Sequence, residues 1–291
     1  MFKENGFNNL VNSISLQIFK NLFISIAEEM GVTLGRTAYS PNIKERLDYS
    51  CAVFDKHGQM IAQAAHIPVH LGSMSSSIEQ AIKNQHCFDG DIIILNDPYL
   101  GGTHLPDITL VSPIYINNTL EGFIANRGHH ADIGGMTPGS LPLSTDVHQE
   151  GLIIPPIKLY SQGNLNEDVF QLICRNSRTP GERRGDLSAQ IASIRTGEKR
   201  MKDVISKYGI HEVIEHMDAL MNYSEVLMKK TISGIPNGNY TYTDFMDDDG
   251  ISSDKIPISV SITVNNDLVT VDFTGTSDQR YGCVNTPYAV A

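Results

Sequence analysis

The chain has 291 residues, of which 41% are hydrophobic and 19% are charged, as is ordinary for a globular protein with a substantial core. Its formal net charge of −11 argues against a nucleic-acid-binding protein, which usually carries a basic face. The apolar stretch at 16–31 contains Lys20 and runs into Glu28 and Glu29, which argues against both a signal peptide and a membrane span. We therefore expect a cytoplasmic protein with neither a membrane nor a nucleic-acid partner.

The first third of the chain alternates between helical and strand patterns. Apolar residues recur every four positions from Ile14 to Met30, which predicts a helix over 13–31 that ends at Gly31. Strands are predicted at 49–54 and 60–65 around the turn sequence DKHG. The chain is then expected to form a loop that becomes helical near 78–82.

A predicted β-hairpin follows a short apolar strand at 91–95. Residues 108–116 and 119–125 have strand patterns on either side of Asn117-Asn118, a pair that suits a type I′ turn. Because a hairpin returns the chain to its starting level, the segments 104–107 and 127–132 are expected to become neighbours. The segment 134–158 is rich in Gly, Pro, Ser and Thr and predicts a long functional loop.

The second half is predicted to contain two helices and a β-rich module. Helices are expected at 186–207, with Asp186 as the N-cap, and at 211–230. Beyond residue 238 apolar and polar residues alternate, as in antiparallel strands. The fold class predicted is mixed α/β (α+β), mostly antiparallel sheets with flanking helices and long functional loops. We expect a metal-site domain at 1–235 and a β-rich module at 236–291 that is incomplete at its C-terminus.

Metal-ligand residue types cluster at the two ends of the predicted hairpin. His104 and Asp107 lie on a turn in HLPD, and His129 lies in RGHHAD, so the three could form a two-histidine, one-carboxylate site for a divalent metal. The residues alone leave a second interpretation open, in which these are hydrogen-bonded polar loop residues. We predict His130 and Asp132 as catalytic residues, His130 for proton transfer and Asp132, or alternatively Asp97, as a partner of a metal-bound imidazole; a structural interpretation stays open for each.

Other polar residues have weaker patterns. Asp97 and His148 form a second group of candidates, and the structural interpretation is favoured for both. Arg46 and Asp48 could form an ion pair or hold an anionic substrate. The sequence HIPVH contains histidines four positions apart, His66 and His70. The proline between them indicates an extended loop, and both are interpreted as structural.

The remaining motifs limit the kind of chemistry. Four arginines, Arg175, Arg178, Arg183 and Arg184, could bind carboxylates or a partner protein, although a loop that neutralises neighbouring acids is favoured. The four cysteines lack any CxxC spacing and predict free thiols. The sequence contains no GxxxxGK[ST], GxGxxG or GxSxG motif, so it gives no sign of a nucleotide site or a serine nucleophile.

Six segments, in order along nearly the whole chain, together resemble one family. They are ERLDYSCAVFD, GQMIAQAAHIPVHLGSM, GDIIILNDPYLGGTHLPDITLVSPIY, RGHHADIGGMTPGS, EGLIIPPIKLY and RTPGERRGDLSAQIAS. The family is that of hydantoinase B and oxoprolinase, which includes the B-type subunits of N-methylhydantoinases, the C-terminal half of 5-oxoprolinase, and the alpha subunits of acetone and acetophenone carboxylases.

The resemblance implies a subunit of an ATP-dependent enzyme. A hydantoinase A-type partner would bind ATP, and the pair would open a cyclic amide such as 5-oxoproline or a hydantoin. The divalent metal would be Mn, Zn or Fe, held by His104, Asp107 and His129, and would activate water or polarise the carbonyl. Two alternatives remain, the alpha-type subunit of a ketone carboxylase and a non-catalytic truncated fragment that binds metal or docks a partner.

Overall fold

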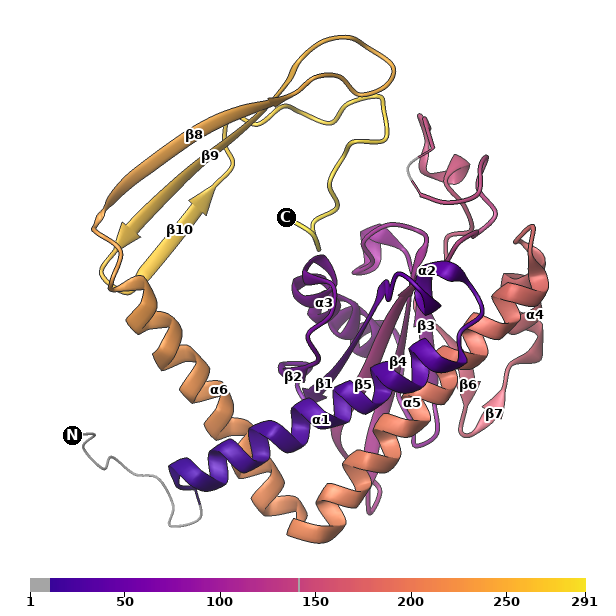
Figure 1. Ribbon diagram of the computed structural model, residues 1–291, viewed down its shortest axis with the longest axis vertical. Coiled ribbons are helices and arrows are strands. Elements are labelled where there is room, and N and C mark those ends of the chain that lie inside the picture. Colours follow the sequence, from indigo (N-terminus) through magenta and orange to yellow (C-terminus); the bar gives the residue numbers. More distant parts are fainter. Residues whose placement is uncertain (1–10, 141) are drawn as a thin grey trace.

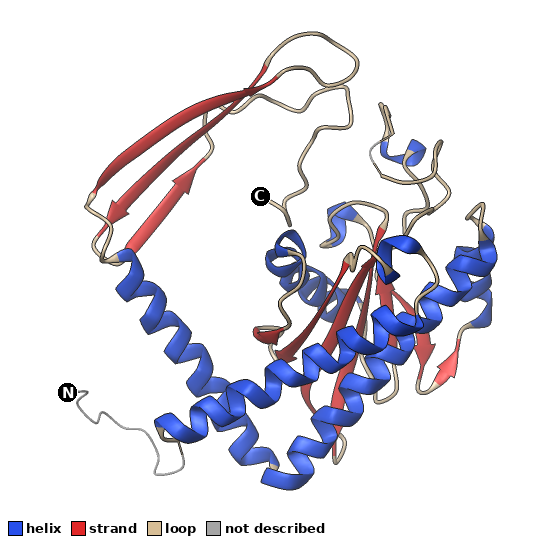
Figure 2. Cartoon of the chain, in the orientation of Figure 1, coloured by secondary structure: helices blue, strands red, loops and turns tan. Residues whose placement is uncertain are grey.

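The computed structural model describes residues 11–140 and 142–291, and it confirms the predicted mixed α/β class. A seven-stranded antiparallel sheet is flanked by helices, and a three-stranded antiparallel sheet lies apart from it (Figures 1 and 2). In spatial order the larger sheet contains β2 (Met60–Gln63), β1 (Tyr49–Asp55), β5 (Thr119–His129), β4 (Asp107–Ile116), β3 (Ile92–Leu95), β6 (Ile157–Ser161) and β7 (Asn164–Leu165).

The predicted hairpin is confirmed and forms the centre of this sheet. Strands β4 and β5 pair antiparallel. Ile116 lies opposite Thr119 next to the turn, and Asp107 lies opposite His129 at the other end of the ladder. Asn117 and Asn118 have φ angles of 49° and 66°, the left-handed conformation that both central residues of a type I′ turn require. Strand β5 extends four residues beyond the predicted end, and this extension places His129 opposite Asp107.

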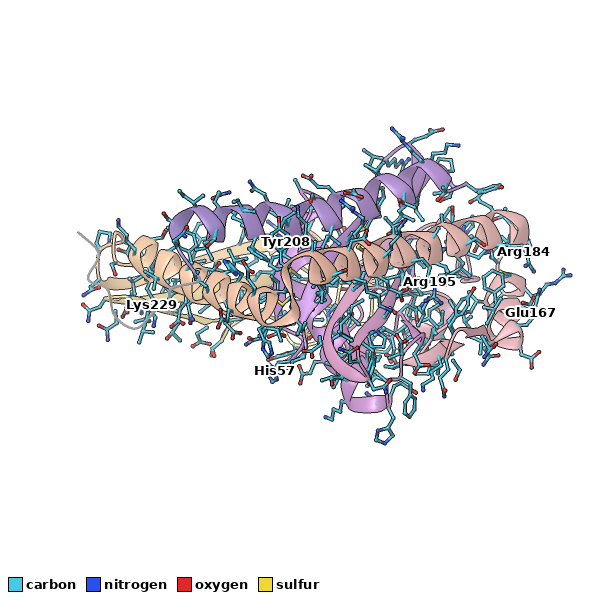
Figure 3. The ribbon with its side chains drawn as sticks, turned by 90° about the horizontal axis from the view of Figure 1, so that it is seen from below. His57, Glu167, Arg184, Arg195, Tyr208 and Lys229 are labelled. Atoms are coloured by element: carbon cyan, nitrogen blue, oxygen red, sulfur yellow. The ribbon has the colours of Figure 1, made fainter. Side chains whose placement is uncertain are left out.

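Helices α1 (Ser13–Thr37) and α5 (Pro180–Tyr208) lie side by side on one face of the sheet (Figure 3). Helix α1 begins with a capping box between Asn12 and Ser15. On α5, a Cβ atom at Gly197 would lie 2.5 Å from the Met30 sulfur and 2.7 Å from a methyl carbon of Ile124, so glycine permits the close approach of α5 to α1 and β5.

Helix α3 (Pro68–Asn84) covers the opposite face and begins earlier than the predicted helical segment. Alternate residues of the strands point to the two faces, so the sheet contributes to two separate hydrophobic cores. Met74 and Ile78 of α3 pack against Val111 and Phe123 in the smaller core. The polar residues predicted as metal ligands lie at the end of the sheet, where β4 begins and β5 ends.

Several elements were not predicted or were placed differently. Helix α4 (Glu167–Arg175) and strands β6 and β7 were missed, and short helices occur at α2 (Pro41–Lys44), η1 (Pro98–Leu100) and η2 (Val147–Gln149). Asp186 as a helix N-cap was wrong, because α5 begins at Pro180. Instead, the buried Asp186 carboxylate accepts hydrogen bonds from the backbone N–H groups of Tyr39 and Ser40, and thereby joins α5 to the segment before α2.

Helix α6 (Ile210–Ile232) leads to the smaller sheet, which contains β8 (Gly238–Met246), β9 (Ile256–Asn265) and β10 (Leu268–Asp272). Figure 1 shows this sheet at the far end of α6, away from the larger sheet. The predicted boundary at 235/236 falls between α6 and β8, and the division into two domains stays a prediction. Among the described residues, none of the helices combines the length and apolar character needed to cross a bilayer.

Candidate metal site

The residues predicted as metal ligands converge where β4 begins and β5 ends. Asp107 and His129 face each other as a register pair of the hairpin. His104 lies on the turn before β4, in which the Asp107 N–H donates to the His104 carbonyl oxygen at 2.9 Å. The expectation that the two ends of the hairpin would be neighbours is therefore confirmed.

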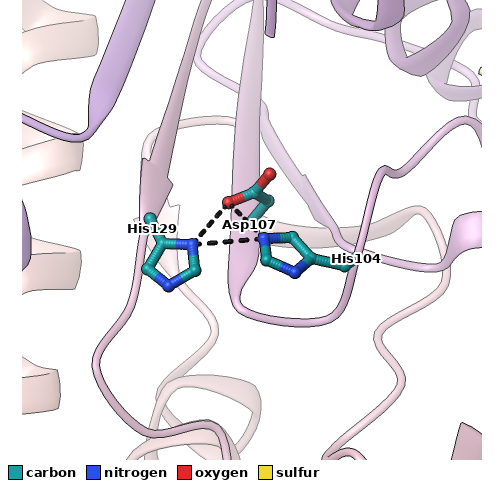
Figure 4. A group of neighbouring side chains, drawn as sticks. All are labelled: His104, Asp107 and His129. Carbon is teal, nitrogen blue, oxygen red and sulfur yellow. Dashed lines mark hydrogen bonds and ion pairs between the residues drawn. The ribbon is translucent and has the colours of Figure 1, made fainter. Parts of the chain in front are cut away.

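Three ligand atoms from these residues lie close to one another (Figure 4). Asp107 Oδ1 is 3.1 Å from His104 Nε2 and 3.0 Å from His129 Nδ1, and the two nitrogens are 3.2 Å apart. Donors bound to one cation at about 2.1 Å and at right angles would be roughly 3 Å apart. The donor types and their separations therefore fit one face of a divalent metal's coordination shell, with other positions open. Metal binding itself stays a prediction.

The second oxygen of Asp107 is held by other side chains. Thr103 Oγ1 donates to Oδ2 at 2.5 Å, and His70 Nε2 lies 3.3 Å from the same atom. Burial of Asp107 opposes its ionisation, but hydrogen bonds from His104, His129 and His70 outweigh that effect and hold the pKa of the carboxyl well below its usual range. The aspartate is thus kept as an anion with a fixed orientation.

The charge of Asp107 also affects His104. Burial lowers the pKa of the His104 imidazole, but the hydrogen bond and the charge of Asp107 outweigh burial and leave that pKa raised. A proton therefore competes for the nitrogen that would bind a metal, since only the neutral imidazole is a ligand.

His70 belongs to this site, although the sequence pattern favoured a structural role. The proline at position 68 begins α3 instead of extending a loop, and places His70 in the first turn of the helix. The Nδ1 atom of His70 lies 3.1 Å from Ser50 Oγ. His66 has the structural role predicted for it, because its Nδ1 accepts from the Cys51 N–H at 3.2 Å.

A cavity of about 430 Å³ opens beside the cluster, within the range of roughly 300–1,000 Å³ typical of small-molecule sites. The metal-ligand candidates and His70 line one part of it. Ile67 and Val69 supply apolar surface, and Arg46 and Asp48 line it as well. Of the two possibilities considered for Arg46 and Asp48, the ion pair is not formed, because none of the ion pairs within 4.0 Å among the described residues joins them.

His130 points away from this cavity, since neighbouring residues of a strand alternate between its two faces. Arg183 Nη1 donates to His130 Nδ1, so the other ring nitrogen carries the proton and donates to Gln190 Oε1 at 2.8 Å. Burial and, next, the charge of Arg183 lower the pKa of His130 well below its usual value. The structure thus places this neutral, enclosed imidazole outside the cluster.

Asp132 is also separate from the cluster. Its carboxylate accepts from the N–H groups of Gly134 and Arg178 at 2.9 and 2.7 Å, and from Arg178 Nη1 at 3.0 Å. Burial opposes ionisation, but these hydrogen bonds and the Arg178 charge lower the pKa of Asp132. The catalytic roles predicted for His130 and Asp132 stay predictions.

The other candidates serve the local structure. Asp97 caps η1 by accepting from the Tyr99 N–H, and the exposed His148 pairs with Asp146. Two of the four arginines contact acids, as favoured: Arg178 binds Asp132, and the buried Arg183 contacts Glu182 and Asp186. Arg184 lies over the ring of Phe170.

Comparison with known proteins places the chain among relatives of greater length. It is 43% identical to an uncharacterized protein of Methanocaldococcus jannaschii over 96% of this chain and 50% of that protein. It is 36% identical to 5-oxoprolinase 1 of Arabidopsis thaliana, over 97% of this chain and 24% of that protein. The putative B-type subunit of a D-/L-hydantoinase of Pseudomonas sp. is also 36% identical, over 92% of this chain and 48% of that protein.

Two solved structures have the same fold. The ATP-dependent caprolactamase from Pseudomonas jessenii matches with a TM-score of 0.90 and 29% identity, over 97% of this chain and 49% of that chain. Acetone carboxylase in its nucleotide-free form matches with a TM-score of 0.86 and 20% identity, over 94% of this chain and 38% of that chain. At this identity the likeness shows the fold alone. Residues 12–291 match the hydantoinase B/oxoprolinase family, and the chain belongs to that family.

Proposed function

We propose that the chain is a subunit of an ATP-dependent cyclic amide hydrolase that opens the ring of 5-oxoproline or a hydantoin. The observation that carries this proposal is the meeting of His104, Asp107 and His129 at the wall of a cavity. We propose that these residues hold Mn²⁺, Zn²⁺ or Fe²⁺. A hydantoinase A-type partner would bind ATP, which agrees with the lack of a nucleotide-binding motif in this sequence.

Each side chain at the site would have a distinct task. The chemistry supplied by a divalent cation is polarisation of a carbonyl group and a lowered pKa of water. His104 and His129 would present neutral nitrogens, while His70 and Thr103 fix the Asp107 carboxylate. Asp48 lines the same cavity, and its side chain is 32% exposed. Both ring nitrogens of His130 are bonded to Arg183 and Gln190, so the proton transfer predicted for His130 would require one of these hydrogen bonds to break.

The sequence identities of this chain to its relatives favour the hydrolase over the ketone carboxylase. The 5-oxoprolinase of Arabidopsis and the hydantoinase protein of Pseudomonas are each 36% identical to this chain, and the caprolactamase is 29% identical. Acetone carboxylase is 20% identical and supports the fold only. The non-catalytic fragment stays an alternative, since the chain spans half or less of the relatives compared.

Metal analysis of the purified chain tests the site. We expect about one divalent ion per chain. Replacement of either histidine in His104→Ala or His129→Ala should remove most of it, because each variant loses one of three donors. His148→Ala is the matched control, since this exposed imidazole pairs with Asp146 instead. Metal content that is unchanged in both His104→Ala and His129→Ala would contradict the assignment.

Activity is tested with the A-type partner co-expressed. We expect ring opening of 5-oxoproline or hydantoin that requires ATP and is lost in His129→Ala but kept in His148→Ala. A parallel assay supplies acetone and bicarbonate with ATP. Carboxylation without ring opening would favour the carboxylase alternative, and no product in either assay would favour the non-catalytic fragment.

A further inference from the structure

Arg46 is the cationic side chain among the described residues that line the cavity. The other lining residues comprise the acids Asp48 and Asp107, three histidines, and neutral side chains. Arg46 is exposed and its guanidinium makes no hydrogen bond or ion pair to any described residue. Five N–H donors are therefore free beside the candidate metal ligands.

Several other arginines of the described chain form ion pairs with acids, whereas Arg46, which lines the cavity, does not. Ion pairs with carboxylates occupy Arg178, Arg195, Arg200 and Arg280. The carboxylates nearest the cavity do not serve Arg46, because Asp107 is surrounded by histidines and Thr103, and Asp48 lies beyond ion-pair distance of Arg46. Arg46 thus brings to the cavity a positive charge with which no described carboxylate pairs directly.

The backbone holds Arg46 in a fixed place relative to the metal-ligand candidates. Its N–H donates at 3.0 Å to the carbonyl oxygen of Pro41, the first residue of α2. Leu47 then has a φ angle of 56°, a conformation that leucine rarely adopts. The carbonyl oxygen of the following residue, Asp48, accepts a hydrogen bond from the His129 N–H at 2.9 Å. The loop that carries Arg46 is therefore tied directly to β5 at a candidate ligand.

We propose that Arg46 is a specificity-determining residue that binds an anionic substituent of the substrate, so that the site selects cyclic amides carrying a carboxylate. The planar guanidinium matches a carboxylate with two parallel hydrogen bonds. Ile67 and Val69 supply an apolar surface for the carbon atoms of a small ring. The inference rests on the proposed function, and it names the substrate class for the same cavity.

The test compares two lactams with the same ring, 5-oxoproline, which carries a carboxylate, and 2-pyrrolidinone, which does not. Binding of each to the full chain is measured by ligand-observed NMR in the presence of Zn²⁺. We expect 5-oxoproline to bind about tenfold more tightly than 2-pyrrolidinone. This is the lower end of the effect of a hydrogen bond to a charged group, and we expect the lower end because Arg46 is exposed to solvent. Arg46→Gln should abolish this preference and leave the affinity for 2-pyrrolidinone unchanged.

Three further arms make the result specific. Arg46→Lys keeps the charge without the planar fork and should retain part of the preference. Lys44→Gln removes an exposed charge two residues away that does not line the cavity, and should behave as the parent chain. In the assembled enzyme, Arg46→Gln should raise KM for 5-oxoproline while kcat is kept.

The outcomes separate this inference from the proposed function. Equal affinities for the two lactams in the parent chain, or a preference that survives Arg46→Gln, would overturn the role of Arg46 even if Zn²⁺ binds and ring opening occurs. The parent chain could instead bind the two lactams equally and release both when inorganic phosphate is added. That result would assign Arg46 to a phosphoryl group and overturn the carboxylate proposal. A chain that binds neither Zn²⁺ nor a lactam would contradict both proposals.

Discussion

The two adjacent histidines at the end of β5 differ in environment because a strand directs successive side chains to opposite faces. His129 points to the cavity and contacts Asp107, while His130 points to α5 and is enclosed by Arg183 and Gln190. Gln190 in turn donates to the Ile108 carbonyl oxygen and to Asn126. His130 therefore belongs to a buried hydrogen-bond network that fixes β5 against α5, directly behind the candidate ligand.

Replacement of His130 should reduce stability. In His130→Ala the buried Arg183 and Gln190 each lose a partner, and we expect the free energy of unfolding to fall by about 2–4 kcal/mol, since each buried unsatisfied group costs roughly 1–3 kcal/mol. Urea unfolding followed by circular dichroism measures the change. His148→Ala, at an exposed position, should change it little. A variant as stable as the parent that has lost kcat in the assembled enzyme would instead support the predicted proton transfer by His130.

The sequence indicated some of the site residues but not all, for reasons of distance along the chain. His104, Asp107 and His129 flank one hairpin, so a local turn signal at Asn117-Asn118 was sufficient to bring them together. His70 reaches Asp107 from α3, which packs against one face of the sheet, and a contact of this kind depends on helix placement that no local pattern encodes.

At the scale of elements, the larger sheet and the smaller sheet differ in how they are buried. Strands β4 and β5 are buried along most of their length between α3 on one face and α1 and α5 on the other. Almost all residues of β8 and β10 are exposed, and on β9 only Ile256 and Val264 are buried. The smaller sheet therefore depends mainly on its own ladder, which gives a three-stranded sheet limited stability.

Hydrogen exchange should report this difference. We expect the amides of 238–272 to exchange within minutes, while those of β4 and β5 remain protected for hours, because exposed ladders open without global unfolding. Mass spectrometry of peptides from 107–129 and 238–272 compares them in one sample. Equal protection of the two regions would contradict the prediction and would indicate that another surface covers the smaller sheet.

Strongly patterned elements were predicted and weakly patterned ones were missed. The alternation in β8–β10 and the four-residue spacing in α1 were sufficient to predict those elements. Strands β6 and β7 are short, and β6 joins the sheet by pairing with β3, more than 60 residues earlier in the chain. The residues of α5 before Asp186 lack an apolar repeat, so the start of that helix was placed six residues too late.

At the scale of the whole molecule, the candidate site brings together side chains from separate elements of the chain. Its residues come from the turn before β4, from the paired ends of β4 and β5, and, through His70, from the start of α3. Family membership follows from residues 12–291, whereas the proposed chemistry depends on this one junction. A cation bound here would therefore act as a cross-link between several elements.

Metal binding should accordingly raise the thermal stability of the chain. A ligand that binds only the folded state adds about 2.7 kcal/mol to the free energy of unfolding at a free concentration about 100 times its Kd. For a chain of this size, we expect Tm to rise by about 4–5 °C between EDTA and excess Zn²⁺ or Mn²⁺. Scanning calorimetry measures the shift, which His148→Ala should keep.

His104→Ala and His129→Ala should lose most of the shift, because each removes one donor of three that lie within 4.8 Å of one another. Their Tm values in EDTA serve as the reference, so that a general loss of stability is not mistaken for a loss of metal binding. If both variants keep the full shift, the metal binds elsewhere in the chain, and the stabilising junction is not the hairpin end.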